Sequence, residues 1–323
     1  MKINIYKFFH TQLSNMNQLQ DTAEKIRTME IRGAGRIASA AATAIHDYVK
    51  NLDAETIQEF DDKVQKAAKI LVNTRPTAVS LPNAVWMSVK HSKTNVDDAR
   101  EEIINNANRF IKQADYALEN IGKIGSKRIQ DGDVIMTHCN SHAALSAITT
   151  AFEQGKNISV ITTESRPRKQ GLLNIKHLND YNIPTTYIVD SAVRSCMKNV
   201  DKVIVGADAI SVNGALINKI GTSQLALAAH ESRVNLLVAA ETYKFSPSTI
   251  QGEMIEIEDR PTDEVINPDE LRDLPYVEVK NPAFDVTPAE YIDLIITDAG
   301  VIPPSMAYFI IKEYLGWELG DID

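Results

Sequence analysis

The sequence of 323 residues is long enough for two domains, and its 44% apolar and 24% charged residues are typical of a globular protein. The net charge of −9 argues against a general nucleic-acid-binding protein, and no apolar run is long enough to cross a membrane. The only cysteines, Cys139 and Cys196, do not form a disulfide framework, which favours a cytoplasmic location.

The first half of the chain has the pattern of an extension followed by helices. Residues 1–16 mix apolar side chains with Asn4 and Lys7 and lack a small-residue cleavage site, so we expect a disordered extension rather than a signal peptide. Apolar residues then recur at helical spacing, which predicts an all-helical domain over residues 17–128. We expect helices over residues 19–31, 37–49, 55–72, 81–89 and 95–122.

From Asp131 the pattern changes to short β-branched runs that alternate with helices. We expect strands over residues 134–137, 158–161, 185–189, 203–205, 234–239 and 294–297. We expect helices over residues 141–152, 172–181, 193–199, 224–230 and 306–314. This alternation predicts an α/β fold, with a doubly wound parallel sheet over residues 129–323. The proline-rich segment after Phe245 is expected to be an arm or a loop that packs on a neighbour.

An acidic side chain follows the strand predicted at residues 203–205. Asp208 lies beyond the small pair Gly206-Ala207, at the strand end where open α/β sheets bind ligands. We expect a tight loop next, with a turn at Asn213-Gly214, and then Asn218-Lys219 before a helix whose amino terminus suits a phosphate. The alternative is that Asp208 caps this helix and Lys219 is solvated.

A cysteine follows the strand predicted at residues 134–137. Cys139 precedes a helix, and a thiol at a helix amino terminus has a lowered pKa, so it can serve as a nucleophile or a base. The alternative is a small buried thiol without chemistry. His138 is a candidate proton partner, but His138, Cys139 and His142 are too close in sequence for a structural zinc site, so we expect no metal.

Arginines and glycines lie together in the helical half. The run from Arg32 to Arg36 contains Gly33, Ala34 and Gly35, and its amides and guanidinium groups could clamp an anion. It lacks the preceding strand and third glycine of a dinucleotide fingerprint. The alternative is a helix–helix turn with solvated arginines. Arg75, beside Pro76, is either an exposed cap or a rigid anion ligand.

Four chemically active residues follow predicted strands at one edge of the sheet: Cys139, Arg166, Asp208 and Lys244. If such residues were placed independently of one another, they would not all be expected at the same edge of the sheet. Because that edge binds ligands in open α/β sheets, the four together indicate a small phosphorylated ligand.

The motifs around these residues resemble those of the archaeal ribose 1,5-bisphosphate isomerases. This family belongs with methylthioribose 1-phosphate isomerase and the regulatory subunits of translation initiation factor 2B. The resemblance extends from Gln18 to Gly316. Its motifs are Met29–Gly35, Thr74–Val79, Thr137–Cys139, Gly206–Asp208, Asn213-Gly214, Asn218–Thr222, Glu241–Phe245 and Asn281–Pro288.

The resemblance implies a helical domain, a Rossmann-like domain and a specific reaction. Cys139 would be the proton acceptor and Asp208 the proton donor in the conversion of α-D-ribose 1,5-bisphosphate to D-ribulose 1,5-bisphosphate, during AMP degradation. The substrate would be bound by Arg32, Gly33, Ala34, Gly35, Arg75, Ser141, His142, Ala143, Asn218, Lys219 and Lys244. His142 stands where the family commonly has lysine. The resemblance also implies a homo-oligomer, between a dimer and a hexamer, with no cofactor and no metal.

Two other functions stay open within this superfamily. Methylthioribose 1-phosphate isomerase shares the cysteine and the aspartate, but the run Asn140-Ser141-His142 lacks the glycine-containing segment associated with that enzyme. A non-catalytic regulatory subunit, similar to those of translation initiation factor 2B, would need no acid–base pair. The presence of both Cys139 and Asp208 favours an enzyme.

Overall fold

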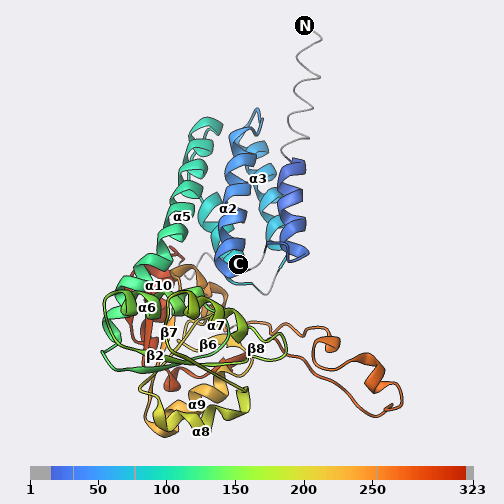
Figure 1. The fold of residues 1–323 in the computed structure, drawn as a ribbon. Coiled ribbons are helices and arrows are strands. Elements are labelled where there is room, and N and C mark those ends of the chain that lie inside the picture. Colours follow the sequence, from blue (N-terminus) through green and yellow to red (C-terminus); the bar gives the residue numbers. More distant parts are fainter. Residues whose placement is uncertain (1–15, 32, 76–77, 253, 318–323) are drawn as a thin grey trace. The chain divides into compact units, whose positions relative to one another are not determined.

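The computed structural model describes residues 16–31, 33–75, 78–252 and 254–317, which belong to two compact units, Met1–Tyr116 and Ala117–Asp323 (Figure 1). The predicted extension lies outside the described residues except for Met16, which is helical and packs on the core of the first unit. The division between the units falls inside one long helix, whereas the sequence suggested a boundary at residue 128. Among the described residues, no helix is both long enough and apolar enough to cross a bilayer.

The first unit is helical, as its periodicity predicted. A helix over residues 16–27 is followed by α2 (Ala34–Lys50), α3 (Ile57–Val72), α4 (Ser80–Val89) and most of α5 (Val96–Gly125). The apolar faces of these helices form one core around residues such as Ile45 and Phe60, both fully buried. The threonine before α3, Thr56, caps that helix by accepting a hydrogen bond from the Glu59 amide at 3.2 Å.

The glycine-containing run at the start of α2 is more helical than expected. Only Gly33 adopts a positive φ, of 92°, and α2 begins at the next residue. Gly35 therefore belongs to the first helical turn, not to a loop. At Gly33 the positive φ costs little, because glycine has no Cβ.

The second unit is built on a seven-stranded sheet, which confirms the predicted α/β class. In spatial order the strands are β10 (Gly300–Ile302), β9 (Leu294–Thr297), β7 (Asn235–Ala239), β4 (Lys202–Val205), β1 (Val134–Thr137), β2 (Ser159–Thr163) and β3 (Thr185–Ile188). All neighbouring pairs are parallel except β10 and β9. After α5, the described α-helices of this unit are α6 (His142–Glu153), α7 (Gly171–Asp180), α8 (Val193–Cys196), α9 (Thr222–Ser232) and α10 (Ala307–Glu313).

A second, antiparallel sheet replaces the loop expected between β4 and α9. Strands β5 (Ala209–Ile210) and β6 (Leu216–Lys219) form a hairpin, and β8 (Phe284–Thr287) pairs with β6. The predicted turn at Asn213-Gly214 is confirmed, with the Gly214 amide donating to the Ser211 carbonyl at 2.9 Å. The sequence did not indicate this sheet, because β5 has only two residues and β8 comes much later in the chain.

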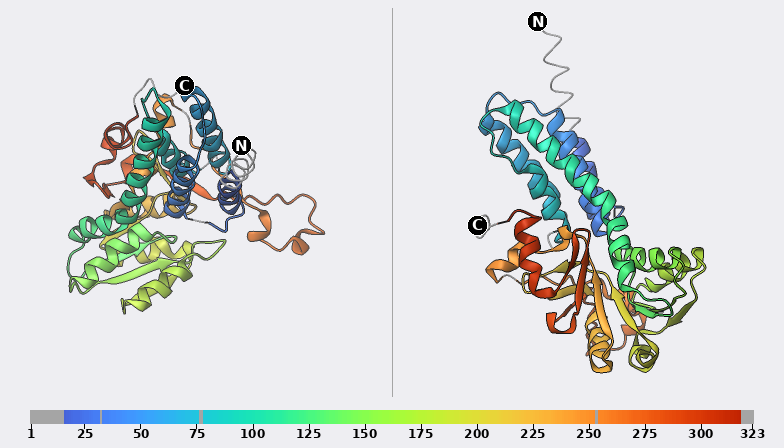
Figure 2. Two further views of the ribbon diagram at one scale, coloured as in Figure 1. Left: turned by 90° about the horizontal axis from the view of Figure 1, so that it is seen from above. Right: turned by 90° about the vertical axis from the view of Figure 1, so that its left-hand side faces the viewer.

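The proline-rich segment forms an arm on the second unit (Figure 2, orange). Short 3-10 turns, Pro247–Gln251, Thr262–Glu264 and Pro268–Leu271, interrupt it. Charged hydrogen bonds stabilise the base of the arm, where Arg260 and Arg168 both donate to Glu264. These two partners lower the pKa of Glu264 to about 2.

Candidate active site

The two predicted catalytic residues follow neighbouring strands at the switch point of the sheet. The chain runs from β1 outward to β2 and β3, and it then returns to place β4 on the other side of β1. Cys139 follows β1 and Asp208 follows β4, so both lie at the carboxyl edge where the strand order reverses. The negative charge of Asp208 raises the pKa of the Cys139 thiol, which places the two side chains within electrostatic range.

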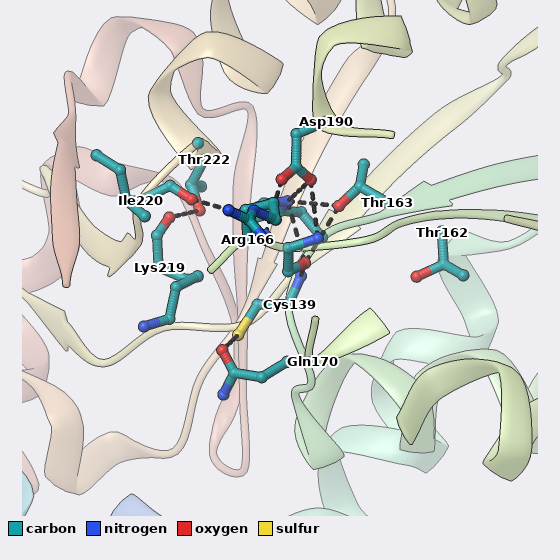
Figure 3. A network of polar contacts seen from close by, with 12 residues as sticks. Cys139, Thr162, Thr163, Arg166, Gln170, Asp190, Lys219, Ile220 and Thr222 are labelled. Carbon is teal, nitrogen blue, oxygen red and sulfur yellow. Dashed lines mark hydrogen bonds and ion pairs between the residues drawn. The ribbon is translucent and has the colours of Figure 1, made fainter. Parts of the chain in front are cut away.

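The backbone and the sulfur of Cys139 are fixed by three side chains that the sequence reasoning missed. Its φ is 62°, in the left-handed region, which a residue with a Cβ seldom adopts. Its amide donates to Ser165 Oγ at 2.8 Å, and its carbonyl accepts from Asn174 Nδ2 at 2.6 Å. The thiol lies 3.4 Å from Gln170 Oε1, as Figure 3 shows. The sulfur therefore occupies a defined position.

The thiol of Cys139 is less acidic than the sequence predicted. Its pKa is raised from 9.0 to about 12, chiefly because the side chain is buried and also because Asp208 lies nearby. The positive charge of Lys219 acts in the opposite direction. The expectation of a lowered pKa was wrong: α6 starts only at His142, with Ser141 as its N-cap, so burial outweighs any effect of the helix terminus on the sulfur.

Because Gly206 has no side chain, α6 can begin close to the end of β4. The hydroxyl of Ser141 caps α6 by accepting from the Ala144 amide at 3.2 Å. A Cβ built on Gly206 would lie only 2.2 Å from that Ser141 oxygen. The other two predicted ligands here differ in exposure, since His142 is exposed in the first turn of α6 and Ala143 is buried.

Asn218 and Lys219 end β6, directly before α9. Asn218 donates to Thr222 Oγ1 at 3.0 Å, whereas the ammonium of Lys219 lies 5.0 Å from the Phe284 ring centroid. The amino terminus of α9 is not open to a phosphate in the way the sequence suggested, because the carboxylate of Asp285 occupies it.

Asp285 caps α9, a role that the sequence did not predict. Its carboxylate accepts hydrogen bonds from the Gly221 amide at 2.7 Å and from Ser223 Oγ at 2.9 Å. Burial raises its pKa even so. Asp285 from β8 thus caps α9.

The remaining strand-end cations are held by other parts of the second unit. Lys244, after β7, is buried, and its ammonium lies 2.8 Å from a carboxylate oxygen of Glu241. Arg166 is exposed and donates to the Val265 carbonyl of the arm at 3.2 Å. Of these two, only Lys244 is enclosed at the sheet edge, while Arg166 ties the arm to the sheet.

The predicted ligands of the first unit lie at helix ends. Gly33, Ala34 and Gly35 form the start of α2, and Arg32 lies outside the described residues. Because Gly33 has no side chain with which to cap the helix, the first amides of α2 remain suited to an anion. Arg75 follows α3 and is half-buried.

The comparisons with known proteins agree on one family. Residues 30–304 match the model of the initiation factor 2 subunit family. The ribose 1,5-bisphosphate isomerase of Methanocaldococcus jannaschii is 53% identical over 95% of this chain and 98% of its own. The methylthioribose-1-phosphate isomerase of Acetivibrio thermocellus is 38% identical over 88% of both chains.

A solved structure has the same fold. The translation initiation factor eIF-2B of Pyrococcus horikoshii superposes with a TM-score of 0.73 and 31% identity, over 88% of this chain and 97% of that chain.

Proposed function

Because this chain belongs to the initiation factor 2 subunit family, we propose that it converts α-D-ribose 1,5-bisphosphate to D-ribulose 1,5-bisphosphate. Its close curated relatives are isomerases, and the chain is an isomerase of the intramolecular oxidoreductase type. The observation that carries the proposal is the placement of Cys139 and Asp208 on adjacent strand ends, where the charge of Asp208 raises the pKa of the thiol.

The two groups share one proton in the working state. In the free protein, the raised pKa favours a thiol at Cys139 beside a carboxylate at Asp208. Moving one proton from the sulfur to the carboxylate yields a thiolate base and a carboxylic acid without changing the total charge. The bound substrate, together with Lys219, would stabilise this second arrangement.

The proton transfers balance over one turnover. Asp208 gives its proton to the ring oxygen, which breaks the bond between that oxygen and C1 and opens the furanose. The Cys139 thiolate takes the C2 proton, and the electrons of that bond form an enediol-like C1–C2 double bond. The thiol then protonates C1, while Asp208 takes the proton of the C2 hydroxyl. Positioned acid–base groups contribute about 10²–10⁴-fold each.

The phosphates explain the number of cations in the proposed site. Two phosphate groups carry a charge of about −3 to −4 near neutral pH, so several positive partners are required. We assign this binding to Arg32, Gly33, Ala34, Gly35, Arg75, Ser141, His142, Ala143, Asn218, Lys219 and Lys244. Lys244 would shift its pairing from Glu241 toward a phosphate, and the first amides of α2 would bind an anion.

One assay distinguishes this function from its nearest alternative. The purified protein is incubated in parallel with ribose 1,5-bisphosphate and with methylthioribose 1-phosphate, and both products are followed by ¹H and ³¹P NMR. Ribulose 1,5-bisphosphate should form and the thiosugar should be inert. Turnover of the thiosugar alone would identify a methylthioribose 1-phosphate isomerase. Inactivity on both, with co-purification of a translation factor, would favour the non-catalytic subunit.

Two further parts of the proposal concern the context of the enzyme. We infer a homo-oligomer between a dimer and a hexamer and a role in AMP degradation, in the cytoplasm. Sedimentation at several protein concentrations tests the first, and a purely monomeric species would contradict it. Accumulation of ribose 1,5-bisphosphate from AMP in a strain that lacks the gene tests the second.

A further inference from the structure

A chain of hydrogen bonds connects the backbone of Cys139 with the loop between β6 and α9. The Cys139 amide donates to Ser165 Oγ at 2.8 Å, and this oxygen lies 3.2 Å from Thr163 Oγ1. Thr163 Oγ1 lies 2.6 Å from His138 Nδ1, and His138 Nε2 lies 2.8 Å from the Ile220 carbonyl. Figure 3 shows the ends of this network, from Cys139 and Thr163 across to Ile220.

One bond of this chain fixes the position of one hydrogen on the imidazole. A carbonyl oxygen only accepts, so His138 Nε2 carries the hydrogen that reaches Ile220. Nδ1 can then accept from the Thr163 hydroxyl, and the Ser165 hydroxyl can donate to Thr163. This pattern satisfies each of these groups with a neutral His138, and it ends at the backbone amide of Cys139 and not at the thiol. The sequence had suggested His138 as a proton partner, but both of its ring nitrogens are engaged elsewhere.

The surroundings of His138 favour the same neutral form. The residue is 2% exposed, and this burial lowers its pKa. The hydrogen bond to the Ile220 carbonyl, then Asp190, 3.8 Å from Nδ1, and Asp285 act against this shift, whereas Lys219 reinforces it.

The loop beyond β6 is shaped to receive the ring. Gly221 has a φ of 102°, and a Cβ on it would lie 3.0 Å from His138 Cε1. The glycine therefore provides both the turn and the space against the imidazole. Lys219 is one residue before Ile220, so the contact holds the backbone next to the lysine whose ammonium acts on the sulfur.

We propose that His138 is a positioning residue which, as a neutral imidazole, fixes the Lys219 loop against the Cys139 loop. The role rests on the proposed function, in which Lys219 favours the thiolate and binds substrate. Losing the contact with Ile220 would let Lys219 move away from the sulfur. The thiol would then become a weaker acid, because Lys219 is a positive charge that lowers its pKa.

Two substitutions separate the two contacts of the ring. In His138→Gln the terminal amide reaches about as far as Nε2 and can still donate to Ile220. In His138→Asn the shorter amide reaches only the position of Nδ1, so it keeps Thr163 and loses Ile220. We expect His138→Asn to lower kcat and the rate of Cys139 alkylation by iodoacetamide at pH 8 about tenfold each, equivalent to one pKa unit. His138→Gln should restore most of both, with thermal melts showing that both variants fold.

Three outcomes would overturn the proposal. An alkylation rate in His138→Asn equal to that of the unmodified protein would show that the contact with Ile220 does not affect the sulfur. A fall in both variants alike would assign the effect to loss of the ring itself. In the unmodified protein, ¹⁵N NMR should give a neutral Nε2–H imidazole between pH 6 and 8, and a titrating ring would contradict the argument. The alkylation and NMR measurements need no substrate, so they decide this role even if the isomerase assay fails.

Discussion

Replacing Asp208 by asparagine should have opposite effects on turnover and on thiol reactivity. With a thiol pKa of about 12, roughly one Cys139 side chain in 10⁴ is ionised at pH 8. Asp208 is the largest contributor to this raised pKa after burial, and removing its negative charge shifts the thiol back toward 9.0. Charges near a protein surface interact by a few kcal/mol at about 4 Å, and about 1.4 kcal/mol corresponds to tenfold in thiolate.

We therefore expect Asp208→Asn to raise the alkylation rate of Cys139 at pH 8 about tenfold. The same variant should lose at least about 10²-fold in isomerisation, since the proton donor is gone. Iodoacetamide labelling followed by peptide mass spectrometry measures the first effect. The half-buried Cys196 is an internal control whose rate should not change. In all variants the logarithm of the rate of Cys139 alkylation should rise with pH until the pH reaches the pKa of the thiol.

A matched charge removal makes the test specific. Asp190 also raises the pKa of the Cys139 thiol, but its contribution is smaller than that of Asp208. Asp190→Asn should therefore accelerate alkylation less than Asp208→Asn does. If Asp208→Asn leaves the Cys139 rate unchanged or slows it, then the two groups are not electrostatically coupled in the free protein, and the shared-proton mechanism is wrong.

Substitutions at three other positions test separate parts of the site. Cys139→Ser should keep its melting temperature within a few degrees and lose about 10³-fold or more in turnover, because a serine hydroxyl is a poor base; near-normal activity would remove Cys139 from the mechanism. Gly206→Ala places a Cβ 2.2 Å from Ser141 Oγ, so urea unfolding should show a loss of about 1–3 kcal/mol, and unchanged stability would contradict this close approach. Asp285→Ala removes the cap of α9 and should cost about 0.5–2 kcal/mol, with Asp285→Asn milder, since its amide oxygen still accepts; equal losses would argue against capping.

Local pattern was sufficient to predict most elements of the fold. The strand over 294–297 and the helix ending at Val72 appear at the expected residues, because hydrophobic period and proline position are local properties. The sheet formed by β5, β6 and β8 was not predicted. Its pairing joins distant segments, and a two-residue strand carries no periodicity.

For the site too, local features could be predicted from the sequence, whereas contacts between distant segments could not. Strand ends are visible in the sequence, so Cys139 and Asp208 could be placed at one edge of the sheet. The predicted direction of the Cys139 pKa shift was wrong, because burial of the thiol depends on the packing of other segments around it. The helix capped by Asp285 and the groups contacted by Gln170 and His138 lie in remote parts of the chain, so local pattern does not predict these contacts.

The crossover that returns from β3 to β4 also has a consequence for how the molecule is made. The ribosome completes β1, β2 and β3 before β4 emerges, so for seconds one side of β1 is a bare strand edge with unpaired backbone groups. Non-local parallel pairing is intrinsically slow, which lengthens this exposure. The step that hides the edge is the same one that brings the carboxyl group to the sulfur, so chains stalled before β4 would be inactive and prone to aggregate.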